Sequence, residues 1–422
     1  MKPYPAYKDS GIEWIGKIPK EWKNSKIKHV LMLLYKSKLE ASEGKEEGLY
    51  PFFTSSIEQN KFIDFAIFDD ECLIMGDGGQ ASINYCEGKF STSSHCLVFK
   101  NKKQKNISLK FIYYQILSNI NIINSLGFSG IGLKNIQRVF FNNMPIYYPP
   151  IQEQLMIASY LDRKTAQIDE LISKKEKIIE LLKEERTAVI NEAVTKGLNS
   201  NAEMKDSGIE WLGDVPENWE VIPLKRLLAE PLMYGANEAS DDDTLGNPRF
   251  VRITDIDVDG NLRDDTFKSL PLDIANRYLL SDGDILLARS GATVGKSFIY
   301  RISWGICCFA GYLIRARVNQ TRIISDYLYF CCQTSFYWQY INSEHIQATI
   351  KNVSAERYSN FIFPLPSVKE QQVIITFLNF KTAKIDTIIA KQERLIEALK
   401  EYRTALISEV VTGKIDVREY AV

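Results

Sequence analysis

The chain contains the stretch KDSGIEWIGKIPKEW at residues 8–22 and repeats it as KDSGIEWLGDVPENW at residues 205–219. Ten of these fifteen positions are identical. A second, longer repeat relates residues 153–195 to residues 370–412, where 24 of 43 positions are identical without a gap. Two such repeats in the same order do not arise by chance, so the chain is a tandem duplication.

The two longer repeats are predicted to be helices. Neither contains glycine or proline, and both are rich in good helix formers. Apolar residues recur three and four positions apart, which gives one apolar stripe per helix. Such a helix packs either on its own globular domain or on the other helix, and its length favours a coiled-coil-like pair of the two. The pattern does not decide between parallel and antiparallel pairing.

The order of the repeats predicts how the chain ends are arranged. In the middle of the chain the first helix runs directly into the short motif, whereas the short motif opens the chain and the second helix closes it. The ends reproduce the middle only if the C-terminus returns to the N-terminus. We therefore expect a closed, pseudo-twofold body in which each helix end meets a KDSGIEW motif, with Trp14 and Trp211 as buried structural anchors.

Two inserts with little sequence in common lie between the repeats, at residues 23–150 (insert 1) and 220–366 (insert 2). Short apolar runs predict strands, and apolar stretches of helical period predict helices, so both inserts are mixed α/β. The predicted strands are 71–75, 96–99, 250–254, 284–288 and 312–318, and the predicted helices lie near 109–124 and 325–342. A shared frame with different inserts indicates one mechanical role performed on two targets.

The charge balance speaks against a protein that binds polyanions through bulk charge. The chain has 52 Lys+Arg and 53 Asp+Glu, a net charge of -1. A local basic surface that binds a polyanion is still possible, because insert 1 has 15 Lys+Arg against 11 Asp+Glu. Insert 2 has one locally basic stretch, which gives a candidate anion-binding face: Arg289, Lys296, Arg301, Arg315 and Arg317.

Membrane, metal and catalytic readings find no support in the sequence. No apolar window is long enough to span a membrane. The 7 cysteines form no C-x-x-C pair and fit reduced thiols in a cytoplasm, and 3 histidines leave little for a metal centre. SGATVGKS (290–297) resembles a phosphate-binding loop, but Ser290 stands where the first glycine is needed. DVDGN (257–261) is a hairpin turn rather than a calcium loop, since Thr266 replaces the required glutamate.

The whole pattern resembles the specificity (S) subunit of type I restriction–modification systems. The resemblance rests on the KDSGIEW motif, a variable insert, PPIQEQ (149–154) or PLPSVKEQ (364–371), and a long helix that ends in EAVTKG (192–197) or EVVTGKID (409–416). It implies a non-catalytic subunit whose two inserts are target recognition domains. Each would read one half of a bipartite double-stranded DNA site.

The resemblance also implies the partners. The repeated helices would pack as an antiparallel pair that sets the spacing of the half-sites and docks two modification (methyltransferase) subunits. No cofactor would bind this chain, because S-adenosylmethionine belongs to the modification subunits and ATP to two restriction subunits that are an optional addition. The complex would act in the cytoplasm.

The predicted fold class is therefore α+β, with two mixed α/β target recognition domains separated by a pseudo-twofold helix pair. The predicted domains are 1–150 (motif and first recognition domain), 151–204 (central helical region), 205–366 (repeated motif and second recognition domain) and 367–422 (C-terminal helical region).

Candidate DNA contacts lie in the loops before each helix, SGIGLKN (129–135) and IQATIKN (346–352), and in two glycine-rich turns, 76–82 and 289–297. Arginine recognises guanine, and asparagine or glutamine recognises adenine, in the major groove, whereas lysine suits phosphate. The candidates are Gln80, Ser82, Lys134, Asn135, Arg289, Ser290, Lys296, Lys351 and Asn352.

Two readings from other classes compete with this one. The chain could be a structural adaptor whose inserts bind proteins, or an enzyme with a site in the 289–297 loop. DNA footprinting with and without a modification subunit separates the three.

Overall fold

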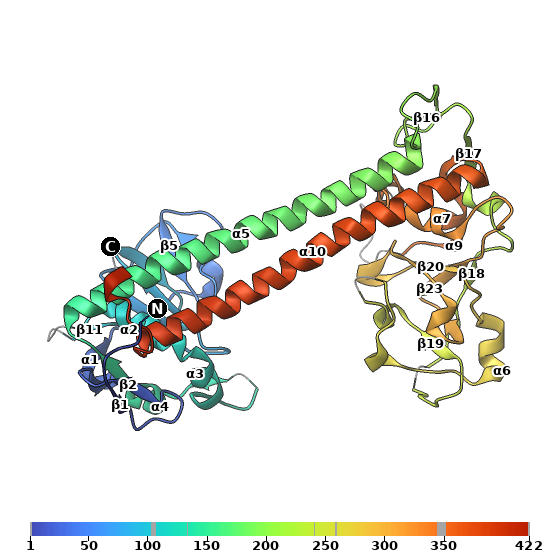
Figure 1. Cartoon of the computed structure of the whole chain (residues 1–422). Coiled ribbons are helices and arrows are strands. Elements are labelled where there is room, and N and C mark those ends of the chain that lie inside the picture. The colour runs from blue at the N-terminus through green and yellow to red at the C-terminus, as the bar shows by residue number, and fades with distance from the viewer. Residues whose placement is uncertain are drawn as a thin grey trace. The chain divides into compact units, whose positions relative to one another are not determined.

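The computed structural model describes residues 2–102, 107–132, 134–239, 241–257, 260–343 and 352–420. The chain divides into two compact units. Unit 1 comprises Met1–Glu176 and Glu393–Val422, and unit 2 comprises Lys177–Gln392. Each unit thus holds one insert together with parts of both long helices (Figure 1). Within the described ranges, no helix is long and apolar enough to cross a membrane.

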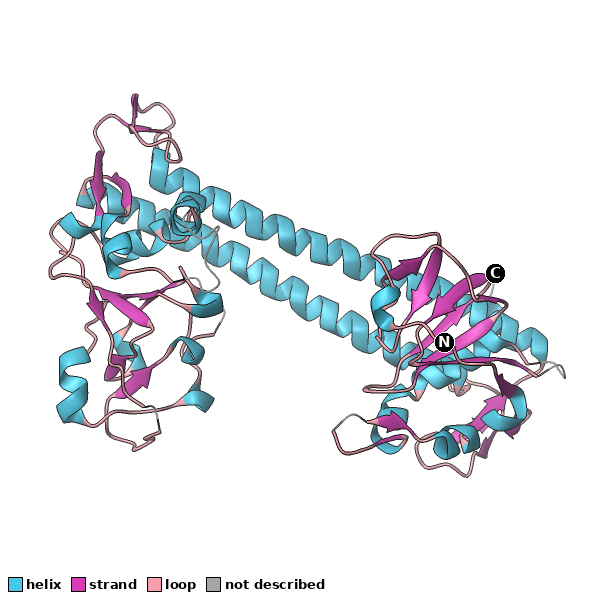
Figure 2. Cartoon of the chain, turned by 180° about the vertical axis from the view of Figure 1, so that it is seen from behind, coloured by secondary structure: helices cyan, strands magenta, loops and turns pink. Residues whose placement is uncertain are grey.

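Two long helices, α5 (Ile151–Lys196) and α10 (Val368–Val411), confirm the prediction from the longer repeat. Within each unit a part of α5 lies beside a part of α10 (Figures 1 and 2). In unit 1, Arg403 Nε donates to Asp169 Oδ1 at 2.8 Å. In unit 2, Arg186 Nε donates to Asp386 Oδ1 at 2.9 Å. From the first of these pairs to the second, the residue number rises along α5, from Asp169 to Arg186. Along α10 it falls, from Arg403 to Asp386. The helices therefore pack antiparallel.

Unit 1 carries insert 1 on this helix pair. Its strands are β1 (Tyr7–Asp9), β2 (Lys17–Pro19), β3 (Lys23–Lys26), β4 (Leu31–Leu33), β5 (Tyr50–Phe53), β6 (Lys61–Ile63), β7 (Phe68–Asp69), β8 (Cys72–Gly76), β9 (Ile83–Cys86), β10 (Lys89–Thr92), β11 (Cys96–Asn101), β12 (Phe128–Ser129), β13 (Asn135–Ile136) and β14 (Pro145–Tyr148). Its shorter helices are α1 (Ile27–Val30), α2 (Leu109–Ser118), α3 (Ile120–Leu126) and α4 (Arg138–Asn143).

Unit 2 carries insert 2. Its strands are β15 (Met204–Asp206), β16 (Asp214–Pro216), β17 (Glu220–Pro223), β18 (Met233–Tyr234), β19 (Arg249–Val251), β20 (Ile285–Ala288), β21 (Ser297–Ile299), β22 (Cys307–Phe309), β23 (Leu313–Ala316) and β24 (Ile362–Leu365). Its shorter helices are α6 (Leu272–Ala275), α7 (Ser325–Cys331), α8 (Ser335–Asn342) and α9 (Ala355–Asn360).

The two inserts share the order and direction of their main strands although their sequences differ. The antiparallel sheet β4-β11-β8-β9 of unit 1 corresponds to β18-β23-β20-β21 of unit 2. The parallel pair β5/β10 corresponds to β19/β22, and the antiparallel pair β3/β14 to β17/β24. Both inserts are therefore mixed α/β, as predicted, and the duplication extends through them.

Most predicted elements within the inserts are confirmed, including the strands at β8, β11, β20 and β23. The predicted strand 250–254 is wrong beyond Val251, where a single 3-10 turn follows. The turn forms because the fully buried carboxylate of Asp255 accepts hydrogen bonds from the backbone and guanidinium of Arg252, at 2.8 and 2.7 Å. The hairpin turn at 257–261 is present in its described part, since Asp257 N donates to Asn261 O at 2.9 Å.

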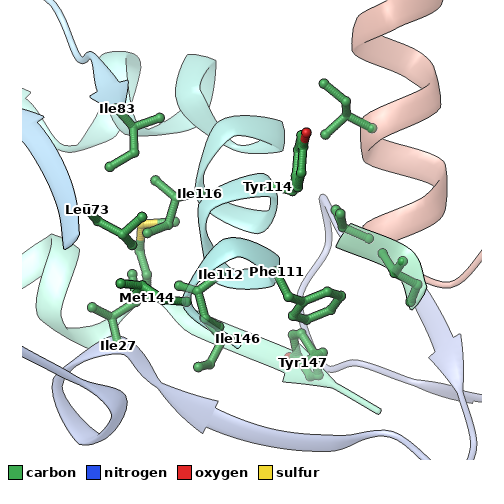
Figure 3. Packing of buried hydrophobic residues seen from close by; sticks show 14 of the residues in the cluster. Ile27, Leu73, Ile83, Phe111, Ile112, Tyr114, Ile116, Met144, Ile146 and Tyr147 are labelled. Carbon is green, nitrogen blue, oxygen red and sulfur yellow. The ribbon is translucent and has the colours of Figure 1, made fainter. Parts of the chain in front are cut away.

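In unit 1 a single hydrophobic core joins the insert to the long helices. Phe111, Ile112 and Ile116 of α2 belong to the same cluster as Leu73 of β8 and Ile146 of β14 (Figure 3). The same cluster continues into buried residues of α5 and α10. Because one core includes both parts, the insert is held on the helices by burial of apolar surface rather than by a flexible linker.

Each long helix ends against the short motif, as the order of the repeats predicts. Gly413 follows α10 with a φ of +71° and lies against Trp22 of the first motif. Gly197 follows α5 with a φ of +74° and lies against Trp219 of the second motif. In unit 1 the C-terminal segment also returns to the N-terminus, since Asp416 N donates to Lys2 O at 3.0 Å.

The buried anchor of unit 1 is Trp22 rather than Trp14. Trp22 is 1% exposed, and its indole Nε1 donates to Glu153 Oε1 at 3.2 Å. Trp14 is 45% exposed, so its prediction as a buried anchor is wrong.

The different environments of the two equivalent tryptophans explain that error. Trp211 is partly buried and stacks on Phe361, with ring centroids 6.1 Å apart. By the register of β24 and β14, Met144 stands at the position of Phe361 in unit 1. Trp14 therefore lacks the aromatic partner that covers Trp211.

Each insert also binds the last turn of a long helix. In unit 2 the hydroxyl of Tyr327 donates to Val194 O of α5 and Pro364 O of β24, at 3.2 and 3.1 Å. In unit 1 the amide of Gln115 donates to the equivalent carbonyls, those of Val411 and Tyr147. Carbonyls at a helix end have no intrahelical partner, and here the insert supplies one.

Candidate nucleic-acid interface

In unit 1 the glycine-rich turn and the loop before β13 form one surface. The backbone N–H of Gly79 donates to Lys134 O at 2.7 Å, and that of Ile136 donates to Asp77 O at 3.0 Å. Gly78 and Asn135 form an isolated β-bridge. The exposed side chains of Gln80, Lys134 and Asn135 are thereby brought together.

Unit 2 joins its corresponding segments in the same manner. Ser290 and Asn352 form an isolated β-bridge, and Val353 N donates to Arg289 O at 2.8 Å. Arg289 Nε also donates to Asn352 Oδ1 at 3.4 Å. The candidates Arg289, Ser290 and Asn352 therefore lie together as well.

These contacts place residues of the two units in equivalent positions. The backbone N–H of Asp77 donates to His95 O, and that of Arg289 donates to Tyr312 O, each at 3.0 Å. Asp77 thus corresponds to Arg289, and His95 to Tyr312. One backbone frame thus presents different side chains in the two units.

Three other candidates lie apart from these clusters or outside the described residues. Ser82 is 3% exposed, and its hydroxyl donates to Ser55 O at 3.3 Å inside the turn, so no free face of it reaches the surface. Lys296 is exposed in the 289–297 loop, near the start of β21. Lys351 lies outside the described residues.

In unit 1 the carboxylate of Asp77 holds the side chains of Lys36 and His95 at the surface. Lys36 Nζ forms an ion pair with Asp77 Oδ2, and His95 Nδ1 lies 3.6 Å from Asp77 Oδ1. The side chain of Asp77 is only 16% exposed, against 41% for Lys36 and 57% for His95. Lys36 and His95 thus face solvent beside the turn. Sequence reasoning missed both, because neither lies in a motif or near the turn in sequence.

Unit 2 places the ring of Tyr234 against the side chain of Arg289 and pairs the backbone of Arg289 with that of Tyr312. The guanidinium carbon of Arg289 lies 4.6 Å from the ring centroid of Tyr234. Tyr234 is 40% exposed and Tyr312 is 66% exposed. These two tyrosines were also missed, since Tyr234 lies 55 residues before Arg289 in the chain.

The basic stretch of insert 2 does not form the anion-binding face that its sequence suggested. Arg315 is 4% exposed and pairs with Glu230 at 3.1 Å, and burial lowers the pKa of its guanidinium. Arg317 binds Asp284 at 2.6 Å, a hydrogen bond that raises its pKa. Arg301 pairs with Asp326. Acids distant in sequence thus neutralise three of the five cations, which leaves Arg289 and Lys296.

Comparison with known proteins identifies the class to which this architecture belongs. The family model for the type I restriction modification DNA specificity domain matches residues 19–181 and 216–398. The chain therefore belongs to this family and is a type I restriction–modification specificity subunit with two target recognition domains. As such it is not itself catalytic.

Its relatives agree over nearly the full length. The chain is 23% identical over 420 residues to the type I restriction enzyme MjaVIII specificity subunit of Methanocaldococcus jannaschii, with 95% of each chain covered. It is 24% identical over 435 residues to the EcoKI specificity subunit of Escherichia coli strain K12, with 95% of this chain and 90% of that one covered.

A solved structure from work on complex assembly and conformational transition of the type I R-M system has a similar fold. Its TM-score is 0.69 at 14% sequence identity, covering 94% of this chain and 99% of that chain.

Proposed function

We propose that each recognition domain reads one half of a bipartite double-stranded DNA site, and that the surface described above in each unit is the reading surface. The observation that carries the proposal is the common backbone frame, in which equivalent contacts join the glycine-rich turn to the loop before the long helix. Side chains that differ at equivalent positions give the two halves different sequences. Base edges rather than phosphates carry that specificity.

The proposed contacts are those whose side chains face solvent on the two surfaces. In unit 1 they are Gln80, Lys134, Asn135, Lys36 and His95. In unit 2 they are Arg289, Ser290 and Asn352, and Lys296 and Lys351 join them by their places in the sequence. Gln80 and Asn135 carry amides suited to adenine, whereas the lysines suit phosphate. Ser82 is left out, since its hydroxyl is used within the turn.

The helix pair has two roles in this proposal. It sets the spacing between the half-sites, and it docks one modification subunit for each recognition domain, with restriction subunits added where the system cleaves DNA. Support comes from the antiparallel register, which gives each unit an equivalent helix surface. S-adenosylmethionine and ATP would bind these partners, and the complex would act in the cytoplasm on the DNA there.

Footprinting of DNA tests the proposal. Purified chain with two modification subunits should protect two patches separated by an unprotected gap, and methylation should fall on adenines in those patches. The nearly neutral chain should bind DNA weakly without these partners. A single continuous protected patch, or protection unchanged when the modification subunits are omitted, would contradict it.

Arginine-to-alanine substitution tests the assignment of unit 2. Arg289→Ala should relax the sequence requirement in one half-site and leave the other unchanged, as read from the map of methylated adenines. The same set of methylated sites with no new ones would remove Arg289 from the reading surface.

A further inference from the structure

We infer that Arg289 reads a guanine in the half-site of the second recognition domain, and that Tyr234 is the positioning residue that holds its guanidinium in place. This inference rests on the proposed function and names the base class that one site would take.

The backbone of Arg289 is fixed on both sides. Its N–H donates to Tyr312 O at 3.0 Å, and its carbonyl accepts from Val353 N at 2.8 Å. The residue directly follows β20, a buried strand at the centre of the sheet. The side chain therefore starts from a rigid base, which a precise contact to a base edge requires.

Tyr234 then restricts the guanidinium itself. Its ring centroid lies 4.6 Å from the guanidinium carbon, a stacked cation–π contact. The ring is fixed in turn, since the Tyr234 hydroxyl accepts a hydrogen bond from Ala355 N at 3.0 Å. Tyr234 also belongs to β18, which pairs with β23.

The donor pattern that remains fits guanine. Arg289 Nε is used by Asn352 Oδ1 at 3.4 Å. Among the residues that the structure describes, the Nη1 and Nη2 groups of Arg289 have no partner. Two adjacent N–H donors in a planar fork match the O6 and N7 acceptors of guanine. Asn352 is thereby assigned to holding Arg289, since its carbonyl oxygen is occupied.

The equivalent position in unit 1 favours a base over a phosphate as the ligand. Asp77 stands there, with a charge opposite to that of Arg289. Phosphates are the same at every step of DNA, so a phosphate contact has no reason to reverse its charge between two units built on one frame. A position that reads bases changes its side chain with the base that it reads.

The test uses the complex of the full chain with its modification subunits and a library of duplex DNA randomised over the site. Selection with the wild type should show a required guanine at one position of the second half-site. Arg289→Gln should lower that preference by about 10- to 100-fold and leave the first half-site unchanged. Arg289→Lys, which keeps the charge without the fork, should lose the guanine preference and keep most of the affinity.

Tyr234 is tested by a pair of variants and a cycle. Tyr234→Leu should lower the same preference by about 2- to 5-fold. Tyr234→Phe keeps the ring and loses only the hydroxyl that accepts from Ala355 N, so it should lower the preference less than Tyr234→Leu does. In the double variant Tyr234→Leu with Arg289→Gln, the tyrosine change should have no further effect. A purely structural role would not give partial rescue by phenylalanine and dependence on Arg289 together.

Three outcomes would overturn the inference. One is a uniform loss of affinity for all sequences in Arg289→Gln, which means a phosphate contact. Another is an unchanged guanine preference in that variant. The third is an effect of Tyr234→Leu at a different position or one independent of Arg289. Absence of any protected half-site with the wild-type complex would instead contradict the proposed function, and so is distinguishable from these three.

Discussion

The hydroxyl of Tyr327 in α7 contacts the end of α5, and its removal should measure how firmly the second recognition domain is fixed to that helix. Tyr327→Phe takes away the group that donates to Val194 O and Pro364 O at 3.2 and 3.1 Å. The aromatic ring remains, so no cavity of note is created. Tyr327 is fully buried, and burial raises the pKa of its hydroxyl, which therefore stays protonated and able to donate.

The expected loss follows from what the substitution leaves behind. Val194 lies in the last turn of α5, where its carbonyl has no intrahelical partner after the helix ends at Lys196. Without Tyr327 this buried carbonyl loses its side-chain donor. An unsatisfied buried acceptor costs about 1–3 kcal/mol, so we expect unit 2 to lose about 2 kcal/mol of stability.

Chemical denaturation followed by tryptophan fluorescence gives the free energy of unfolding, with separate transitions fitted if the two units unfold separately. Tyr312→Phe is the matched control, because its side chain is 66% exposed and the change should stay within about 0.5 kcal/mol. Equal stabilities for the two variants would refute the view that the Tyr327 hydroxyl ties the domain to α5.

Further predictions concern the junction of α10 with the first motif. Gly413→Ala should lower the melting temperature, with a cost of about 2–4 kcal/mol, because φ is +71° and the added Cβ would lie 2.3 Å from Pro19 Cγ. An unchanged melting temperature would show that the junction is loose. Trp22→Ala should cost about 3–5 kcal/mol in chemical denaturation and Trp14→Ala less than about 1 kcal/mol, and equal costs would contradict the assigned anchor. A hydrogen bond from the side chain of Arg418 lowers the pKa of Asp416 from its ordinary value of 3.8. The stability that this carboxylate contributes is present above that value and is lost as the pH falls below it. Hydrogen exchange of residues 414–420 should therefore accelerate relative to the rest of the unit at pH 3, and Asp416→Asn should show the faster exchange already at pH 7. Equal exchange in the variant and the wild type at pH 7 would refute this.

The frame could be predicted from the sequence because duplication marks it directly. Identity between the repeats located α5 and α10 and indicated that the C-terminus returns to the N-terminus. The apolar stripe did not give the direction of pairing, since it is the same in either direction, and the antiparallel prediction came from the family resemblance alone. The direction depends on pairs such as Arg186 with Asp386, which are 200 residues apart in the chain.

The equivalence of the inserts was hidden for a different reason. The contacts that define the proposed reading surface are mostly backbone hydrogen bonds, such as Ile136 N to Asp77 O and Val353 N to Arg289 O. Backbone groups do not constrain side chains, so the sequences diverged while the frame stayed. Sequence could propose the two turns and loops, but not that Tyr234 lies against Arg289.

Sequence identity alone also gave the wrong anchor. Trp14 and Trp211 are identical positions of the motif, yet burial depends on what packs against them. Phe361 stacks on Trp211, while the residue at the matching place in unit 1, Met144, has no aromatic ring. A repeat shows which residues correspond, whereas the exposure of each is decided by neighbours outside the repeat.

The two inserts donate hydrogen bonds to the helix-end carbonyls through different side chains, and this has a practical consequence for building chimeras. The frame offers the same pair of carbonyls in each unit, and one insert meets them with the amide of Gln115 and the other with the phenol of Tyr327. An insert transplanted whole brings its own donor and needs no adjustment of the recipient helix. A crossover within α2 or α7 that separates this donor from the rest of its insert would leave the recipient carbonyls without a hydrogen-bond donor. Junctions for exchange therefore belong in the repeated motif and the long helices, where most positions of the two copies are identical.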